Sequence, residues 1–594
     1  MPFHGRAAVM SKDNLLPKLT YLVLLVSFAA HAQTDDALLN PDPSDWLMYS
    51  RTYDNQRFSP LRQINRDNVI HLKLAWARAM HPGTQENIPL VYKGVMFVAH
   101  PGAIIQALNA ADGEVLWEYQ RELPDDVTAY IRAVGRTRTL AIYENTVFYA
   151  SPDGYVLALD ARNGKLRWET QIHDYKSSTQ HTTGPLVING KVITGRNCGD
   201  TRKYCFIAAH DAETGEELWK FFTTAAPGEP GGDTWGSMPA DLRLASPWGL
   251  PGGFDPKKNL LYWGTANPNP HTRIKRHNGK PFDVPLSAPA ELYSNSTVAL
   301  NPDTGELAWY YQHLPGDDWD SDHTHERVLF RSSFNPDPKE VKWINPNINR
   351  GHLRDMVVSV GEPGGLWVLD GASGEFLWAT PFPFDTPDFH IDDIDVETGI
   401  TSISRDKILT GEGEQHTTCF QNTRSYWPMA YHPGENALYV PYHDACVTRT
   451  GDMSVTNGHR RTTHARAGSD PDKFAGLAKI NMSTGHIRRL HTQRTPANGA
   501  VLLTAGDLVF WGDMSGTLYA IDTESGEILW DARVQGIIQT STITYAADGK
   551  QYVAVLTGEG LSGTSGPLSV VSELKPTRRN NSIYVFALPD ELGQ

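Results

Sequence analysis

The stretch "ALDARNGKLRW", residues 158–168, places a short apolar strand, a turn ending in Gly164 and a second strand ending in Trp168 within eleven residues. Asp or Asn leading into Gly is typical of tight hairpin turns. The chain repeats this pattern in "ALNAADGEVLW" (107–117), "AHDAETGEELW" (209–219), "ALNPDTGELAW" (299–309), "VLDGASGEFLW" (368–378), "AIDTESGEILW" (520–530) and, without the tryptophan, "KINMSTGHIRR" (479–489). Seven hairpins of one design indicate a repeated, all-β fold.

The spacing of these hairpins predicts the kind of repeat. Successive turn glycines lie 51, 51, 90, 69, 111 and 41 residues apart. A unit of about 40–50 residues is the length of one four-stranded propeller blade, so the longer gaps indicate insertions on one face. We therefore predict an all-β, eight-bladed β-propeller of four-stranded antiparallel blades. The eighth blade would use "NSIYVFAL" (581–588) and be closed by "LKLAWARAM" (72–80), which leaves no free sheet edge.

The repeated tryptophans fit a structural role, because a large aromatic side chain at a fixed position of every blade can pack against the next blade. No ligand is needed to explain them.

The first 32 residues predict an export signal. Arg6, Lys12 and Lys18 precede the apolar run "LTYLVLLVSFAA" (19–30), and Ala30-His31-Ala32 forms a cleavage pattern. The run is too short to span a bilayer, and no later stretch is long and apolar enough for a membrane helix. We expect a mature chain of residues 33–594, one propeller domain, in the bacterial periplasm.

Charge and cysteine content narrow the possible functions. Removing the signal takes away three basic groups and one acidic group, which changes the formal charge from −15 to −17 and disfavours nucleic acid as a partner. The four cysteines allow three pairings, of which Cys198–Cys205 and Cys419–Cys446 close the most local loops. The absence of C-x-x-C-H excludes covalent haem on this chain.

The segment "PGDDWDSDHT", residues 315–324, crowds Asp317, Asp318, Asp320 and Asp322 into six positions. A solvated acidic loop would explain it, because Asp favours turns. A site for a hard multivalent cation would explain it as well, because the cation neutralises the repulsion between the carboxylates.

Ordered motifs add a family resemblance. The repeat, with "YDNQRFSPLRQIN" (53–65), "WGTANP" (263–268) and "DDWDSDH" (317–323), resembles the quinoprotein alcohol dehydrogenases along the whole mature chain. The resemblance implies pyrroloquinoline quinone (PQQ) in a central funnel over a tryptophan ring. It also implies a metal ion on the quinone oxygens and an Asp that takes the proton of the alcohol.

The resemblance assigns the metal ligands and the base. Asp320 falls on the catalytic Asp, Asp322 on an extra ligand of the lanthanide-using members, and Asn267 on an amide ligand. Counting back from "AHDAETG" places Asp200 on a ligand that is usually Glu; the alternative is that Asp200 lies at the tip of the loop between Cys198 and Cys205. For Asp322, a loop carboxylate that does not contact the metal is an equally good explanation. Oxygen ligands of this kind suit Ca²⁺ or a trivalent lanthanide.

The resemblance also assigns contacts to PQQ. They are Glu86, Arg138, Thr182, Gly199 and the ring of Trp248, the last through an alignment that requires a one-residue insertion. Arg138 would pair with PQQ carboxylates.

Several positions depart from the family pattern. The vicinal cysteine pair is missing near Arg132-Ala133, Glu362 stands where a Lys or Arg is usual, and Ser425 replaces an Asn. A branch of the family without the cysteine pair fits best. We interpret Asp317 and Asp318 as solvated turn residues, and His323 and His325 as solvated or hydrogen-bonded, the alternative being a zinc site.

The predicted function is a periplasmic, PQQ- and metal-dependent oxidation of an alcohol, bulky or secondary, to an aldehyde or ketone, with a soluble cytochrome c as acceptor. The loops around 222–250, 268–295 and 380–418 would shape the funnel mouth. The alternative is a propeller without cofactor that serves as a binding or outer-membrane assembly scaffold, favoured by the lost cysteine pair and by Glu362. Oligomeric state leaves no mark in the sequence.

Overall fold

Apolar residues alternate with polar ones throughout the repeats, and the chain accordingly forms short antiparallel strands. The computed structural model describes residues 35–591 except 133, 135, 420–422 and 561–563. The predicted export signal lies outside these residues. Those described belong to one compact unit, Gln33–Gln594.

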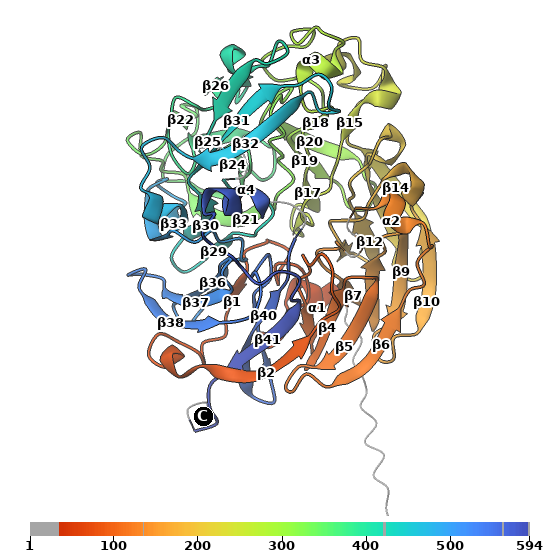
Figure 1. Ribbon diagram of the computed structural model, residues 1–594, viewed down its shortest axis with the longest axis vertical. Coiled ribbons are helices and arrows are strands. Elements are labelled where there is room, and N and C mark those ends of the chain that lie inside the picture. Colours follow the sequence, from red (N-terminus) through yellow and green to blue (C-terminus); the bar gives the residue numbers. More distant parts are fainter. Residues whose placement is uncertain (1–34, 133, 135, 420–422, 561–563, 592–594) are drawn as a thin grey trace, which may run out of the picture. The chain divides into compact units, whose positions relative to one another are not determined.

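Eight sheets of four or more strands surround a common centre, and each is one blade (Figure 1). The first four blades are β3 (Leu90–Tyr92), β4 (Val95–His100), β5 (Ile104–Asn109) and β6 (Val115–Gln120); β7 (Ala141–Tyr143), β8 (Thr146–Ala150), β9 (Tyr155–Asp160) and β10 (Leu166–Gln171); β11 (Pro185–Ile188), β12 (Lys191–Thr194), β13 (Phe206–Asp211) and β14 (Glu217–Phe222); and β16 (Gly253–Asp255), β17 (Leu260–Gly264), β19 (Ser296–Leu300) and β20 (Leu307–Gln312).

The other four are β21 (Val328–Ser333), β23 (Leu353–Val360), β24 (Gly365–Asp370) and β25 (Phe376–Pro381), extended by β22 (Trp343–Ile344); β29 (Ala430–His432), β30 (Ala437–His443), β33 (Ala475–Asn481) and β34 (Ile487–Gln493); β35 (Leu502–Thr504), β36 (Leu508–Gly512), β37 (Thr517–Asp522) and β38 (Ile528–Arg533), extended by β1 (Phe58–Ser59); and β39 (Ile543–Ala547), β40 (Lys550–Thr557), β41 (Ser582–Ala587) and β2 (Lys73–Ala79).

The propeller prediction is confirmed, including its closure. Each repeated hairpin forms the third and fourth strands of a blade, and a register shift interrupts each of these ladders near the tryptophan position. The eighth blade takes β2 from the N-terminal region as its fourth strand, paired antiparallel with β41. The ring therefore has no open edge.

The tryptophans lock neighbouring blades together, as predicted. Trp117 Nε1 donates to the carbonyl of Ala161 at 2.9 Å, in the hairpin turn of the next blade. A Cβ on Gly164 of that turn would lie 2.5 Å from the Trp117 ring. Trp76, Trp168, Trp219 and Trp530 make equivalent hydrogen bonds to the following blade. Glycine is required in these turns both by its positive φ and by the close ring.

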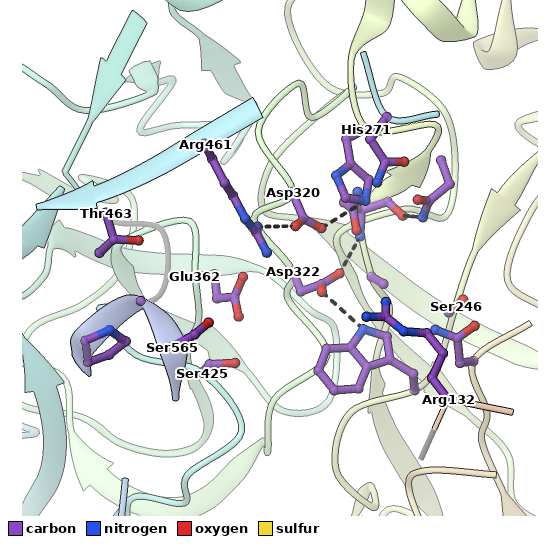
Figure 2. Close-up of a pocket in the computed structure, with 18 of the residues that line it drawn as sticks. Arg132, Ser246, His271, Asp320, Asp322, Glu362, Ser425, Arg461, Thr463 and Ser565 are labelled. Atoms are coloured by element: carbon purple, nitrogen blue, oxygen red, sulfur yellow. Dashed lines mark hydrogen bonds and ion pairs between the residues drawn. The ribbon is translucent and has the colours of Figure 1, made fainter. Parts of the chain in front are cut away.

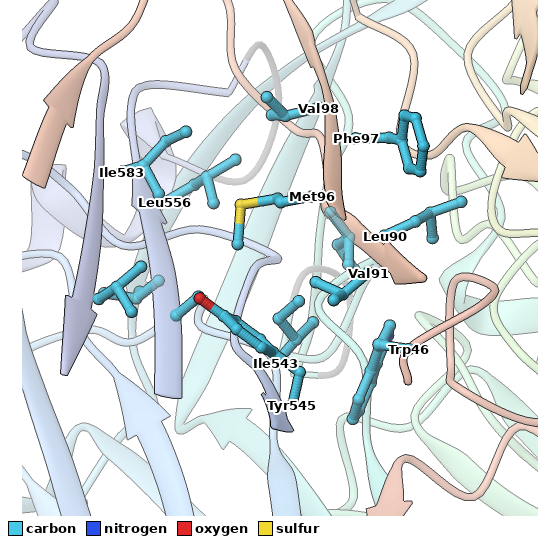
Figure 3. Close-up of a cluster of buried hydrophobic side chains, with 14 of the residues drawn as sticks. Trp46, Leu90, Val91, Met96, Phe97, Val98, Ile543, Tyr545, Leu556 and Ile583 are labelled. Atoms are coloured by element: carbon cyan, nitrogen blue, oxygen red, sulfur yellow. The ribbon is translucent and has the colours of Figure 1, made fainter. Parts of the chain in front are cut away.

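Apolar residues of adjacent blades fill the space between the sheets. Figure 3 shows this between the last and the first blade, where Leu90 and Met96 meet Ile543 and Leu556 beside Trp46. All five side chains are buried.

The chain direction within a blade decides where insertions accumulate. In an antiparallel blade the connection between strands two and three, and the one to the next blade, leave at the same end, opposite the repeated hairpins. Most insertions lie at that end. Residues 334–352, between β21 and β23, lie at the other end, so the prediction of insertions on a single face is correct only in part.

The insertions carry small sheets and short helices. The sheets are β15 (Leu244–Ala245) with β18 (Pro268–Asn269), β26 (Ile391–Ile394) with β27 (Thr401–Ile403), and β28 (Gln415–Thr418) with β31 (Ala445–Gly451) and β32 (His459–Ala465). The α-helices are α1 (Asp35–Leu39), α2 (Val127–Tyr130), α3 (Arg273–Arg276) and α4 (Ser565–Val570). The 3₁₀ turns are η1 (Val69–His71), η2 (Tyr175–Ser177), η3 (Arg202–Tyr204), η4 (Gly232–Trp235), η5 (Ala240–Leu242), η6 (Arg405–Lys407) and η7 (Pro471–Lys473). Helix α4 packs against β32. None of the helices in the described part of the chain is long and apolar enough to cross a membrane.

Both predicted disulfides, Cys198–Cys205 and Cys419–Cys446, are present. The second joins the residue after β28 to β31 and so fastens the edge of the inserted three-stranded sheet.

Candidate active site

A cavity of about 740 Å³ opens at the end of the propeller that carries most insertions (Figure 2). Its walls come from connections between strands two and three or between blades, which explains why residues 435 positions apart meet there. The lining residues are Arg132, Arg136, Asn197, Ser246, Trp248, Ala266, Asn267, Asn269, His271, Asp320, Asp322, Glu362, Ser425, Asn457, Arg461, Thr462, Thr463, Ser565, Gly566, Pro567 and Ser569.

The acidic stretch reaches this cavity through a loop organised by Asp317. Its side chain accepts hydrogen bonds from the backbone N–H groups of Trp319, Asp320 and Ser321 at 2.5, 3.0 and 3.1 Å. Asp320 adopts a left-handed φ of 63°, which turns its side chain out of the loop. Asp317 is therefore the residue that shapes the loop.

The interpretation of Asp317 and Asp318 as solvated is wrong, since both are fully buried. The Asp318 carboxylate accepts from the N–H groups of Arg273 and Leu409 at 2.6 and 2.9 Å. The insertions that carry these donors cover the loop. Burial raises the pKa of both Asp317 and Asp318 to about 6, against the opposing effect of their hydrogen bonds.

Asp320 lines the cavity, and both of its oxygens have partners. Arg461 Nη1 lies 2.5 Å from Oδ2, and His271 Nε2 lies 3.2 Å from Oδ1. Burial opposes ionisation of Asp320, but the neighbouring positive charges outweigh it and lower its pKa. Burial also lowers the pKa of His271 to about 4, so at neutral pH Arg461 provides the permanent charge beside Asp320.

Asp322 lines the cavity beside Trp248 and Asn267. Its Oδ2 accepts from Trp248 Nε1 at 3.1 Å, and its Oδ1 accepts from the Asn267 backbone at 3.0 Å. Burial and the charge of Asp320 raise the pKa of Asp322 to about 8. Burial and the same two aspartates raise the pKa of Glu362 well above its usual value. The cavity thus brings three carboxyl groups together, and two of them resist ionisation.

The ring of Trp248 packs over the guanidinium of Arg138, which lies behind the cavity. The Arg138 guanidinium lies 4.8 Å from the Trp248 ring centre, and Arg138 Nη1 donates to the Trp248 carbonyl at 3.1 Å. Arg138 pairs with Glu86 at 2.8 Å, and Thr182 Oγ1 donates to the Trp248 carbonyl at 2.7 Å. Glu86, Arg138 and Thr182 are fully buried, are not among the residues that line the cavity, and support Trp248; their contact with PQQ stays a prediction.

The structure does not bring Asp200 or Gly199 to the cavity. Asp200 is exposed, near the tip of the loop closed by Cys198 and Cys205. Gly199 has a left-handed φ of 59°, and a Cβ there would lie 2.2 Å from the Ser177 carbonyl, so its requirement is conformational. Asn197, three residues before Asp200, lines the cavity instead. This loop contains the turn η3, so the position of a residue counted along the sequence does not match its position in space.

The donor chemistry can be tested against a metal ion. Among the described residues, no three His, Cys, Asp or Glu side chains converge as metal ligands do. Asp322, Asn267 and Asn197 nevertheless offer carboxylate and amide oxygens to the same cavity, beside Asp320 and Glu362. These oxygens suit a hard cation. His323 and His325 are buried and lie within hydrogen-bonding distance of Ser359 and Ser425 at 3.0 and 3.4 Å, which does not favour zinc.

Several residues that line the cavity were not predicted from the sequence. Arg461, Thr462 and Thr463 lie on β32, and Ser565 and Ser569 lie on α4. These segments, with the loops 222–250 and 268–295, form the wall, whereas 380–418 contributes no lining residue, contrary to expectation. Arg132 lines the cavity where the cysteine pair is missing. No local motif marks any of them.

The described geometry can be compared with known proteins. The family model described as the β-propeller domain of the PQQ-dependent glucose, ethanol and alcohol dehydrogenases matches residues 46–381 and 421–553. The chain belongs to this family. It is a quinoprotein alcohol dehydrogenase, an oxidoreductase that acts on CH–OH donors, and the scaffold alternative is set aside.

Individual relatives of this quinoprotein cover nearly the whole chain. Quinohemoprotein alcohol dehydrogenase ADH IIB of Pseudomonas putida is 30% identical over 607 residues, 97% of this chain and 83% of the relative. Quinoprotein alcohol dehydrogenase PedH of Pseudomonas putida is 28% identical and covers 96% of both chains. A solved europium-containing methanol dehydrogenase is 25% identical, with a TM-score of 0.81 over 93% of this chain and 100% of that one.

Proposed function

We propose that this dehydrogenase oxidises its alcohol in the 740 Å³ cavity, with PQQ on the face of Trp248 and Asp320 as general base. The observation that carries the proposal is the convergence of Trp248, Asp320 and Asp322 in one cavity from segments far apart in the sequence. Each of the three was expected from its motif.

The lining fits PQQ, a flat tricarboxylate quinone. The indole of Trp248 offers an aromatic face, and Nε1 is held by Asp322, which fixes the tilt of the ring. Arg132 and Arg136 offer guanidinium groups suited to carboxylates, and Asn197 and Ser246 offer neutral hydrogen-bonding groups. When bound, PQQ supplies a two-electron acceptor for the hydride of the alcohol carbon.

Asp320 provides the proton acceptor. Its pKa is lowered, so the carboxylate is ionised at neutral pH, and it lines the cavity in which the alcohol would bind. An alcohol hydroxyl within hydrogen-bonding distance can pass its proton to Asp320 as the CH–OH carbon is oxidised.

A hard cation is the proposed partner of Asp322 and Asn267, with Asn197 as a third oxygen donor and Asp320 at its edge. Burial and the charge of Asp320 raise the pKa of Asp322, and a bound cation would favour the ionised form of Asp322. Ca²⁺ and a trivalent lanthanide both suit these donors, and the similarity to a europium-containing enzyme supports testing both. Asp200 has no part in this site.

The proposed substrate is a bulky or secondary alcohol. The cavity volume and the absence of a cysteine pair near the exposed Arg132 support this proposal. A panel of primary, secondary and aromatic alcohols with an artificial electron acceptor would rank them by kcat/KM. The highest kcat/KM for methanol would contradict the proposal.

The proposed location is the periplasm, and the proposed acceptor is a soluble cytochrome c. Two disulfides suit an oxidising compartment. The chain carries no haem-attachment motif, and its negative charge would attract a basic partner.

Asp320→Asn tests the function directly. The purified apo-protein is loaded with PQQ and either Ca²⁺ or La³⁺, and alcohol-dependent dye reduction is measured. We expect the variant to lose at least about 1,000-fold in kcat while it still binds PQQ, since Asn cannot accept the proton. Retained turnover would remove Asp320 from the mechanism. No change of melting temperature or absorbance of the wild type with PQQ and either cation would remove the cofactor site.

A further inference from the structure

Arg461 contacts Asp320 from outside the propeller blades. Its Nη1 lies 2.5 Å from Asp320 Oδ2, although the two residues are 141 positions apart. Arg461 belongs to β32, a strand of the inserted sheet β28–β31–β32, in which β28 precedes β29 and the other two strands lie between β30 and β33. Figure 2 shows its guanidinium reaching from β32 toward Asp320.

The inserted sheet is fastened to the Asp320 loop at a second point. Arg449 on β31 donates to the carbonyl of Trp319, the residue before Asp320, from Nε at 3.0 Å and from Nη2 at 2.7 Å. Its Nη1 donates to Thr418 Oγ1 at 2.8 Å, on β28. The disulfide Cys419–Cys446 joins the same two strands. The sheet is therefore built to hold a fixed position over the loop.

The charges around Asp320 explain what Arg461 adds. Asp322 and Glu362 face the same cavity as Asp320, and His271 Nε2 lies 3.2 Å from Oδ1, the Asp320 oxygen that Arg461 does not contact. The Arg461 side chain keeps 45% of its exposure, against 17% for Asp320, so it approaches from the open side of the cavity. Arg461 therefore supplies a charged contact to Oδ2 from the side on which substrate would enter.

We propose that Arg461 is a positioning residue for the dehydrogenase reaction, which holds the Asp320 carboxylate toward the substrate space. This inference rests on the proposed role of Asp320 as base. It assigns to the inserted sheet a part in catalysis that the propeller blades alone do not supply. Arg461 acts through Asp320 and does not itself touch the carbon and oxygen atoms that react.

The kinetic test compares Arg461→Gln with Arg461→Lys and with Arg460→Gln. Arg460 directly precedes Arg461 on β32. It is exposed and pairs with Asp452 at 2.6 Å, so it serves as a matched control. We expect Arg461→Gln to lower kcat about 100-fold with KM and PQQ affinity within threefold, since a displaced base reduces turnover rather than binding. Arg461→Lys should recover at least tenfold of the loss, and Arg460→Gln should match the wild type. A kcat of Arg461→Gln within twofold of the wild type would overturn the proposal.

A second measurement does not depend on turnover. The apo-protein is labelled with a carbodiimide and an amine, and the modification of Asp320 is quantified by mass spectrometry. We expect at least threefold faster labelling of Asp320 in Arg461→Gln and no change in Arg460→Gln. Equal labelling in all three proteins would overturn the proposal. An equal fall in PQQ affinity, melting temperature and kcat would also overturn it, because that result describes a structural role.

The two proposals fail in different ways. If the loaded wild type oxidises no alcohol, the proposed function fails, while the labelling of apo Asp320 still decides whether Arg461 positions it. If the wild type is active and Asp320→Asn is not, the kinetics of Arg461→Gln decide the positioning role.

Discussion

Asp317 is the residue on which the acidic stretch depends, although it never reaches the cavity. One buried carboxylate satisfies three successive N–H groups and the Asn295 amide, at 2.9 Å, and so fixes the backbone that presents Asp320. Carboxylates that accept several backbone hydrogen bonds commonly organise loops in this way. The crowding of aspartates therefore has two causes, a structural one at Asp317 and Asp318 and a chemical one at Asp320 and Asp322.

Replacement of Asp317 by Ala should therefore damage both stability and activity. It leaves four buried donors without their acceptor, and we expect a loss of about 2–4 kcal/mol in unfolding free energy. The measurement is urea unfolding of the apo-protein, with kcat of the loaded enzyme beside it. Asp406→Ala, at an exposed position of η6, is the control and should change neither quantity. Unfolding curves of the two variants that coincide would contradict this role of Asp317.

Trp248 combines an aromatic face with a hydrogen bond, and two substitutions separate them. Trp248→Phe keeps an aromatic ring but removes the donor to Asp322. We expect it to weaken cation affinity about tenfold, since a group that orients a ligand carboxylate is lost, and to change PQQ affinity much less. Trp248→Ala should weaken PQQ binding far more. PQQ quenching of protein fluorescence and cation-dependent melting measure the two affinities. Wild-type cation affinity in Trp248→Phe would show that the hydrogen bond has no such role.

At the scale of the elements, the contact between a tryptophan and the next turn is the unit that repeats. Gly164 has a φ of 70°, and a Cβ there would lie 2.5 Å from the Trp117 ring. We expect Gly164→Ala to lower the unfolding free energy by about 2–4 kcal/mol, through backbone strain and displacement of the ring. Gly549→Ala is the matched control, with a φ of 78° and no atom within 4 Å. It should lose only about 1 kcal/mol. Equal losses in thermal or urea unfolding would rule out the ring contact as a source of stability.

The insertion that carries Asn269 and His271 is held by a buried ion pair. Arg276 contacts Glu291 with Nε and Nη2 at 2.8 Å each and donates from Nη2 to the Asp317 carbonyl at 2.8 Å. Burial of Glu291 alone would raise its pKa, but the Arg276 charge and the hydrogen bonds from His277 and Arg276 lower it to about 2. This pair joins the insertion to the Asp320 loop.

The same pair makes stability depend on acid. A Glu291 pKa below its unfolded value of 4.5 gives stabilisation that is complete above about pH 4.5 and is lost as the pH falls toward 2. The linked free energy is on the order of 3 kcal/mol. Glu291→Gln should be less stable than the wild type at pH 7, and the difference should shrink between pH 4.5 and 2 in urea unfolding. A difference that stays constant over this range would show that Glu291 does not titrate as described.

The repeat could be predicted from the sequence because each hairpin is local. The turn glycine, the preceding Asp or Asn and the tryptophan lie within eleven residues, so one pattern predicts strand, turn and blade. Asp320, Asp322, Asn267 and Trp248 line one cavity, and family motifs are what singled them out in the sequence. Asp200 was misplaced because the loop between Cys198 and Cys205 contains the turn η3, which a count along the sequence does not register. Arg461 was missed because a contact over 141 residues depends on how the inserted sheet packs, and no local spacing encodes that.

For the whole molecule, the decisive feature is that the ring closes without a covalent bond. The eight blades follow one another along the chain, and the N-terminal region adds β1 to the seventh blade and β2, paired with β41, to the eighth. Every opening of the ring must separate this ladder or a contact between blades. The stability of the cavity at the centre therefore depends on residues far from it.

A disulfide across that ladder should consequently stabilise the molecule more than the same disulfide elsewhere. Ala77 on β2 faces Tyr584 on β41, and Asp531 faces Tyr519 at the equivalent position of β38 and β37. The double substitution Ala77→Cys with Tyr584→Cys would close a loop of 507 residues, against 12 for Tyr519→Cys with Asp531→Cys. In the chain-entropy account the longer loop adds about 3 kcal/mol more to the unfolding free energy. Each oxidised pair is compared with the corresponding Ser pair by urea unfolding, since a reductant would also open the native disulfides. We expect the pair at the closing ladder to give the larger gain and to slow hydrogen exchange in β2 and β41. Equal gains at the two positions would mean that the ring does not open at the ladder between its ends.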